Sequence, residues 1–165
     1  MEIAIPSLSW VDFLRIGPVL ILSLFGMLVL LWDAVIRPHG PKEHLAYLSL
    51  TGVILALLLC LRLLGEDLYG TSFGDMLVLD RYALFFYLVF LLGTGLTLLL
   101  SVDYLRREGV AYGEYYALVL FTTVGMMLMA SGLDLILIFL GLEILSLSLY
   151  ILSGYIRTDH RGGES

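Results

Sequence analysis

Charged residues are scarce in this chain, and their scarcity is the first indication of its class. Only 15% of the 165 residues are Asp, Glu, Lys or Arg, whereas 60% are hydrophobic. Soluble domains have about 25% charged and about 45–50% apolar residues. The composition therefore excludes an ordinary soluble domain and indicates an integral membrane protein in contact with a lipid bilayer.

Cysteine and basic residues are also scarce. Cys60 is the only cysteine, so no disulfide can form within the chain. The formal net charge is −6, and no basic stripe is present that would favour nucleic acid as a partner. The sequence has no Cys/His cluster with metal-ligand spacing, no Cys-x-x-Cys motif and no Gly-rich dinucleotide loop after a strand. We therefore expect no metal, cofactor or redox centre in this chain.

Long apolar runs predict an all-α fold, a polytopic transmembrane helix bundle that forms one membrane domain over residues 1–165. A helix needs about 20 apolar residues to cross the hydrocarbon core of a bilayer. Residues 65–80 are expected to form a polar loop, and Ser131 with Asp134 a capping box at the start of the last helix. The five expected helices cover residues 16–36, 45–64, 82–102, 115–130 and 133–156.

The positions of Lys and Arg predict the orientation of the chain, because cytoplasmic loops carry an excess of these residues. Six of them fall on one side of the predicted bundle and three on the other. The side with six is expected to be cytoplasmic, with the N-terminus outside and the C-terminus of this chain inside. The six are Arg37, Lys42, Arg106, Arg107, Arg157 and Arg161, and the three are Arg15, Arg62 and Arg81.

Two rows of small residues recur every four positions within the apolar runs. Such rows let helix backbones approach closely in membranes. We interpret both rows as ordinary helix-packing surfaces, not as binding sites. The first row is Gly52, Ala56 and Cys60, and the second is Gly93, Thr97 and Ser101.

Glu143 is the residue that most strongly suggests a function. It lies in the last apolar run, about ten residues from its start, which is ~15 Å into a helix at ~1.5 Å per residue. This depth is half of the ~30 Å hydrocarbon thickness, so Glu143 would lie near the middle of the bilayer. A charged side chain there costs about 2.5–3.5 kcal/mol on insertion scales, and ionisable residues inside membranes mark functional sites by default. Glu143 is therefore the candidate proton carrier.

Polar residues near Glu143 are predicted to share its face of the helix. At ~100° per residue, Tyr150 falls ~20° from Glu143, Ser146 ~60° away and Gly154 ~20° away. Hydroxyl groups beside a buried carboxyl can order water for proton transfer, so Ser146 and Tyr150 are possible supporting residues. The alternative interpretation is structural: a protonated Glu143 that only hydrogen-bonds across a helix interface.

The residues around Glu143 resemble a known motif. The run Leu140–Tyr150 resembles the fifth-helix motif of subunit N of NADH-quinone oxidoreductase, an antiporter-like membrane subunit of respiratory complex I. The runs 113–118, 125–131 and 101–105 resemble its fourth helix and the end of its third. Ser148 departs from the motif, which often has proline at that position. The resemblance extends over most of the chain and is strongest from Asp80 onward.

The resemblance implies a function and a set of partners. It implies that Glu143 takes part in proton translocation in the bacterial cell inner membrane, together with a lysine on a later, broken helix. Because family members are far longer, this chain resembles their N-terminal third, and the helices with the lysine are missing. NADH, flavin, iron–sulfur clusters and quinone are expected in partner subunits, and other membrane subunits of complex I are expected neighbours. The alternatives are a subunit of a cation/proton antiporter and a structural or assembly membrane protein.

Overall fold

The computed structural model describes residues 9–35, 43–108 and 113–155. In these ranges it has five helices that are long and apolar enough to cross a membrane, which confirms the predicted fold class. The helices are α1 (Trp10–Val35), α2 (Glu43–Gly65), α3 (Arg81–Glu108), α4 (Gly113–Ser131) and α5 (Leu135–Tyr155).

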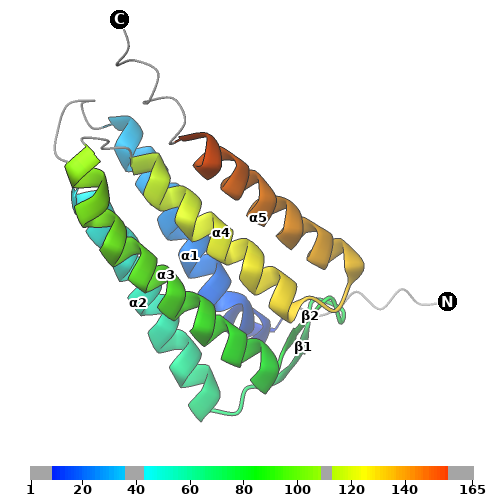
Figure 1. Cartoon of the computed structure of the whole chain (residues 1–165). Coiled ribbons are helices and arrows are strands. Elements are labelled where there is room, and N and C mark those ends of the chain that lie inside the picture. Colours follow the sequence, from blue (N-terminus) through cyan, green and yellow to red (C-terminus); the bar gives the residue numbers. More distant parts are fainter. Residues whose placement is uncertain (1–8, 36–42, 109–112, 156–165) are drawn as a thin grey trace, which may run out of the picture.

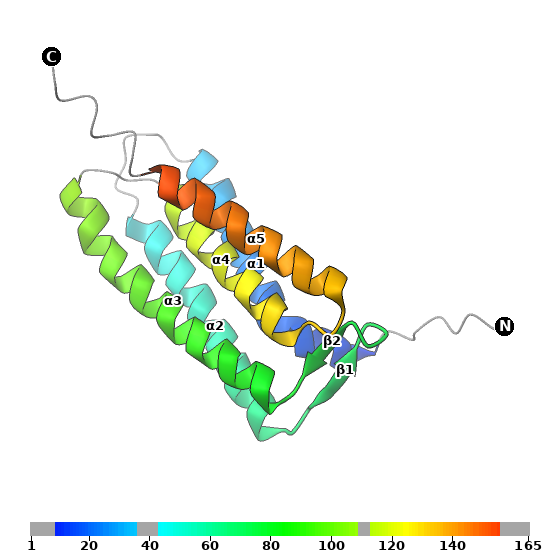
Figure 2. The ribbon, with the colours of Figure 1, turned by 45° about the vertical axis from the view of Figure 1, so that its right-hand side comes forward.

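The helices alternate in direction, and the first four form a closed bundle. Each of α1, α2 and α3 packs against the next helix in the chain, and α4 packs against α1 to close the ring. α5 lies outside this ring along α4, the only helix against which it packs extensively (Figure 1; Figure 2). In their most apolar windows, 56% of the α4 residues are buried but only 11% of the α5 residues. Most of the α5 surface is therefore not covered by the described parts of the chain.

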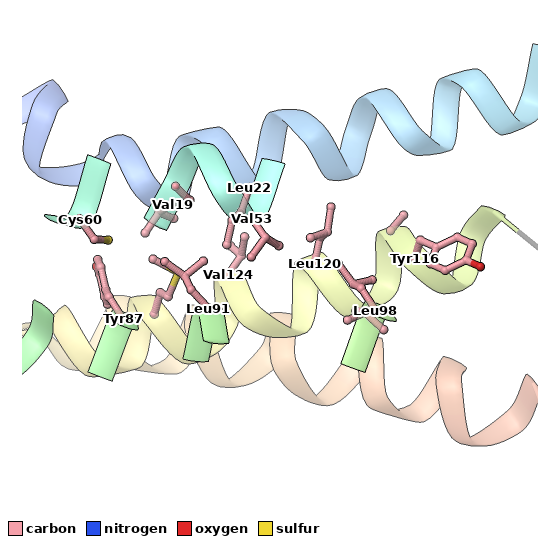
Figure 3. Close-up of a cluster of buried hydrophobic side chains, with 14 of the residues drawn as sticks. Val19, Leu22, Val53, Cys60, Tyr87, Leu91, Leu98, Tyr116, Leu120 and Val124 are labelled. Atoms are coloured by element: carbon pink, nitrogen blue, oxygen red, sulfur yellow. The ribbon is translucent and has the colours of Figure 1, made fainter. Parts of the chain in front are cut away.

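The hydrophobic core lies inside the ring of four helices. Tyr87 of α3 is the largest fully buried side chain, and it lies near Cys60 of α2 (Figure 3). Leu22 of α1 and Leu120 of α4 are also fully buried in this cluster. Among the described residues, no apolar side chain of α5 is buried in this core. α5 thus contributes to this core only from its edge, through the partly buried Leu152.

A β-hairpin replaces part of the loop that was expected between the second and third helices. Strands β1 (Gly70–Ser72) and β2 (Leu77–Leu79) pair antiparallel, with Ser72 opposite Leu77. At the tip, Phe73, Gly74 and Asp75 all have positive φ angles, from 56° to 68°. Leu77 and Leu79 are fully buried against the end of the bundle, which explains why this segment is ordered despite its polar composition.

Acidic side chains cap the starts of α1 and α5, and both starts differ from expectation. α1 begins at Trp10, earlier than predicted, because the Asp12 carboxylate accepts hydrogen bonds from Ser9 N (2.9 Å) and Ser9 Oγ (3.1 Å). The predicted Ser131–Asp134 capping box is wrong. Asp134 caps α5 by itself, accepting a bond from Ile136 N at 2.9 Å. Ser131 ends α4 instead, where its hydroxyl donates to the Met127 carbonyl at 3.0 Å.

One of the two predicted small-residue rows is a packing surface in this chain. Gly52, Ala56 and Cys60 are all buried, and a Cβ on Gly52 would lie 2.7 Å from Cγ of Phe25 on α1. In the second row, Gly93 and Thr97 of α3 are exposed. The first row therefore brings α1 and α2 together, whereas the described helices leave most of the second row uncovered.

Candidate functional site

Two glycines determine how α5 approaches the bundle. A Cβ on Gly125 of α4 would lie 2.6 Å from the Gly141 carbonyl oxygen and 2.7 Å from Leu145 N, both backbone atoms of α5. A Cβ on Gly141 would lie 2.9 Å from the Gly125 carbonyl oxygen. The two backbones are therefore in direct contact, as small residues permit in membrane helices. This contact was not predicted, although both glycines lie in runs that carry the family resemblance.

The close contact fixes which face of α5 points outward. Gly141 and Ser148 are buried against α4, while Glu143 is exposed. Gly141 lies ~160° from Glu143 around the helix at ~100° per residue. The Glu143 side chain therefore points away from the four-helix bundle, beside the exposed apolar residues Phe139 and Leu147.

Ser146 and Tyr150 lie toward the same outward side of α5, but they form no network with Glu143. The Ser146 hydroxyl donates to the Leu142 backbone carbonyl one turn earlier. The Tyr150 side chain is 73% exposed, and seven residues of helix separate it from Glu143 by ~10.5 Å along the axis. Among the described residues, no hydrogen bond joins any two of these three side chains. The shared outward side agrees with the sequence prediction, and the support of Glu143 by hydroxyl groups stays a prediction.

No described cation lies within ion-pair distance of Glu143. Arg15, Arg62 and Arg81 all lie at the hairpin end of the molecule, and each is paired there with a carboxylate: Asp12 (3.7 Å), Glu66 (2.8 Å) and Asp67 (3.9 Å), respectively. Arg37, Lys42, Arg157 and Arg161 lie outside the described residues, and the side chains of Arg106 and Arg107 are not described. Within ranges 9–35, 43–108 and 113–155, no group of three or more His, Cys, Asp or Glu is placed to hold a metal ion.

A groove on the surface of α4 separates α3 from α5. It has a volume of about 550 Å³ and runs from Met126 in the middle of α4 toward Tyr115 near its start. Thr94 and Thr123 share a hydrogen bond of 2.6 Å in its wall, and Ser153 donates to a carbonyl of its own helix. The groove is apolar, its hydroxyl groups are largely bonded to the protein itself, and Glu143 does not line it.

Comparison with known proteins identifies the relatives of this chain. It is 41% identical, over 96% of its length, to NADH-quinone oxidoreductase subunit N 1 of Koribacter versatilis. It is 45% identical, over 91% of its length, to NADH-quinone oxidoreductase subunit N of Trichlorobacter lovleyi. The chain is a relative of NADH-quinone oxidoreductase subunit N. The resemblance inferred from its motifs is thereby confirmed. No family model matches the chain.

A solved structure agrees with the subunit N relationship. The fold superposes on a chain of respiratory complex I from Thermus thermophilus, solved with bound aureothin, with a TM-score of 0.69 and 32% identity. The match covers 85% of this chain and 29% of that chain. The chain likewise spans 32% and 30% of the two subunit N relatives, so it corresponds to about a third of their length. The five-helix arrangement is thus also present in a membrane subunit of a respiratory complex.

Proposed function

We propose that this chain is part of a proton-translocating membrane subunit of NADH-quinone oxidoreductase, in which Glu143 binds and releases the proton. The observation that carries the proposal is a single carboxyl near the middle of α5, on the face turned away from the bundle. The similarity to subunit N over most of the chain supports the choice of complex. The bacterial sources of the relatives support a location in the inner membrane.

The chemistry requires a carboxyl whose charge is set by its neighbours. In an apolar medium the neutral carboxylic acid is favoured, and an approaching cation favours the carboxylate instead. Movement of a cation toward and away from Glu143 would therefore drive release and uptake of a proton. NADH oxidation and quinone reduction would take place in partner subunits, which would hold the NADH, flavin, iron–sulfur clusters and quinone.

The exposed face around Glu143 requires a covering partner. A charge facing lipid at this depth costs about 2.5–3.5 kcal/mol on insertion scales. Lys42 is the only lysine of the chain and precedes α2, so we propose that the cation comes from polypeptide beyond these residues. The relatives, about three times as long, have room for further helices. We place the hairpin end outside and the opposite end in the cytoplasm, next to other membrane subunits of the complex.

Substituting Glu143→Gln in a complex assembled with this chain's sequence tests the proposal. We expect the complex to assemble and oxidise NADH, with a loss of the protons pumped per electron, because glutamine cannot release a proton. Proton uptake by inverted membrane vesicles, measured together with NADH oxidation, gives this ratio. Glu66→Gln is the matched control, since Glu66 directly follows α2, is exposed at the hairpin end and pairs with Arg62 four residues earlier.

Two outcomes would contradict the proposal. If Glu143→Gln leaves the number of protons per electron unchanged, Glu143 is not the proton carrier. If assembly fails while the remaining complexes pump normally, the structural interpretation of Glu143 is correct.

A further inference from the structure

The start of α5 is attached to the hairpin by backbone hydrogen bonds. The carbonyl of Met76, the residue just before β2, accepts bonds from Leu133 N (2.9 Å) and Asp134 N (3.4 Å). Leu77 forms an isolated bridge with Gly132. These residues form the turn between α4 and α5, so the hairpin directly contacts the segment from which α5 begins.

The other strand of the hairpin is fastened to α1 by one arginine. Arg15 donates from Nε to the Leu68 carbonyl (3.1 Å) and from Nη2 to the Tyr69 carbonyl (2.8 Å). Its Nη1 donates to the Thr71 carbonyl (2.6 Å) and to Ser72 Oγ (3.2 Å). The planar guanidinium has five donors in a fixed geometry, whereas a lysine ammonium cannot reach this many separate acceptors. One side chain therefore holds two residues just before β1 and two residues within it.

Gly70 makes the close approach of Arg15 possible. Its φ is +147°, a conformation that residues with a side chain rarely adopt. A Cβ at this position would lie 2.5 Å from Nη2 of Arg15. Asp12, at 3.7 Å from Nη1, balances the charge of the guanidinium, whose side chain is only 15% exposed. The anchor is thus a partly buried contact that requires the shape of the guanidinium and the absence of a side chain at Gly70.

We propose that the β1–β2 hairpin is a strut that fixes the start of α5 relative to α1, and that Arg15 is the positioning residue that anchors it. The strut matters for Glu143 because α5 has little other support: α4 is the only helix against which it packs extensively. Glu143 lies eight residues beyond the first residue of α5, ~12 Å along the axis, so a displaced start would move the carboxyl. This role for the strut rests on the proposed function of Glu143.

Hydrogen exchange of the full chain in lipid nanodiscs tests the strut itself. Arg15→Ala is expected to speed the exchange of the Leu133 and Asp134 amides, because the hairpin that accepts their bonds loses its anchor. Arg62→Ala is the matched control: Arg62 lies at the same end but bonds Glu66, just after its own helix, so it should leave these amides unchanged. Unchanged exchange at Leu133 and Asp134 in Arg15→Ala would overturn the proposal.

A distance measurement tests whether α5 moves. In a Cys60→Ala background, spin labels at the exposed positions Leu24 of α1 and Leu147 of α5 report the placement of α5. We expect Arg15→Ala to broaden or shift this distance, while a second pair, Leu24 and Leu96 of α3, stays the same. An unchanged distance between Leu24 and Leu147 contradicts the positioning role. A change of equal size in both pairs contradicts it too, since the whole bundle would then be loosened.

Conservative variants keep the test decisive if Arg15→Ala does not fold. Arg15→Lys keeps the charge beside Asp12 but loses the multiple contacts, and Gly70→Ala pushes the guanidinium away without removing it. Both are expected to speed exchange at Leu133 and Asp134, and normal exchange in both would refute the strut. Neither measurement requires proton pumping. The exchange and distance measurements can therefore refute the strut while Glu143→Gln still abolishes pumping. They can equally support the strut while Glu143→Gln leaves pumping unchanged.

Discussion

Replacing Gly125 with alanine is expected to destabilise the attachment of α5 to α4 by roughly 1–3 kcal/mol, the range for overpacked sites. The added methyl group would lie 2.6 Å from the Gly141 carbonyl oxygen and 2.7 Å from Leu145 N. Both are backbone atoms, so the strain cannot be relieved by a side-chain rotation. The two helices must separate, and the contact that orients Glu143 weakens.

Gly93→Ala is the matched control, and its expected sign is opposite. Gly93 is also a helical glycine, but nothing lies within 4 Å of a Cβ built there. Alanine is favoured over glycine in helices by about 0.8–1.0 kcal/mol, so this change should be neutral or stabilising. Titration of the reconstituted chain with a denaturing detergent measures both effects. Equal stability of the Gly125→Ala and Gly93→Ala chains would show that the α4–α5 contact is not as close as described.

Replacing Tyr87 with alanine is expected to cost about 3–5 kcal/mol, the range for removal of a buried aromatic side chain. Tyr87 is fully buried in the four-helix core, near the hairpin end of the bundle, and a cavity would remain where its ring packs. Its hydroxyl also donates to Ser131 Oγ at 2.8 Å. The two contributions can be separated, because phenylalanine keeps the ring and removes only the hydroxyl.

Tyr87→Phe is expected to cost much less than Tyr87→Ala. Hydrogen bonds between membrane helices contribute on average about 0.6 kcal/mol and at most about 1.7 kcal/mol. The Ser131 hydroxyl would still donate to the Met127 carbonyl. The same detergent titration gives both values. Similar losses for the two variants would mean that the hydrogen bond, and not the packing of the ring, provides most of the stabilisation by Tyr87.

The helices were predictable because the bilayer imposes a simple length and polarity requirement on the sequence. Hydropathy located all five helices. Glu143 was identified as the candidate site because it is the lone glutamate within the fifth apolar run. The start of α1 had a usable signal in Ser9 and Asp12, a capping pattern just ahead of the apolar run. The hairpin had almost none, since its strands are only three residues long and pattern rules need four or more.

The site was predictable in its residues but not in its contacts. A helical wheel gives directions around an axis, so it placed Ser146 and Tyr150 on the side of Glu143. It cannot show that the Ser146 hydroxyl turns back to the Leu142 carbonyl. The contacts of Arg15 join residues more than fifty positions apart, and no local pattern reports such pairs. In the sequence, Arg15 was therefore only one of the basic residues that predict the orientation of the chain.

Infrared difference spectroscopy of the assembled complex during NADH oxidation tests the role of Glu143 most directly. A carboxylic acid and a carboxylate absorb at different frequencies, so a group that releases a proton leaves a difference signal. We predict a carboxyl signal that is absent in Glu143→Gln and retained in the exposed control Glu66→Gln. A carboxyl signal that persists unchanged in Glu143→Gln would contradict the assignment of Glu143 as the proton-binding group.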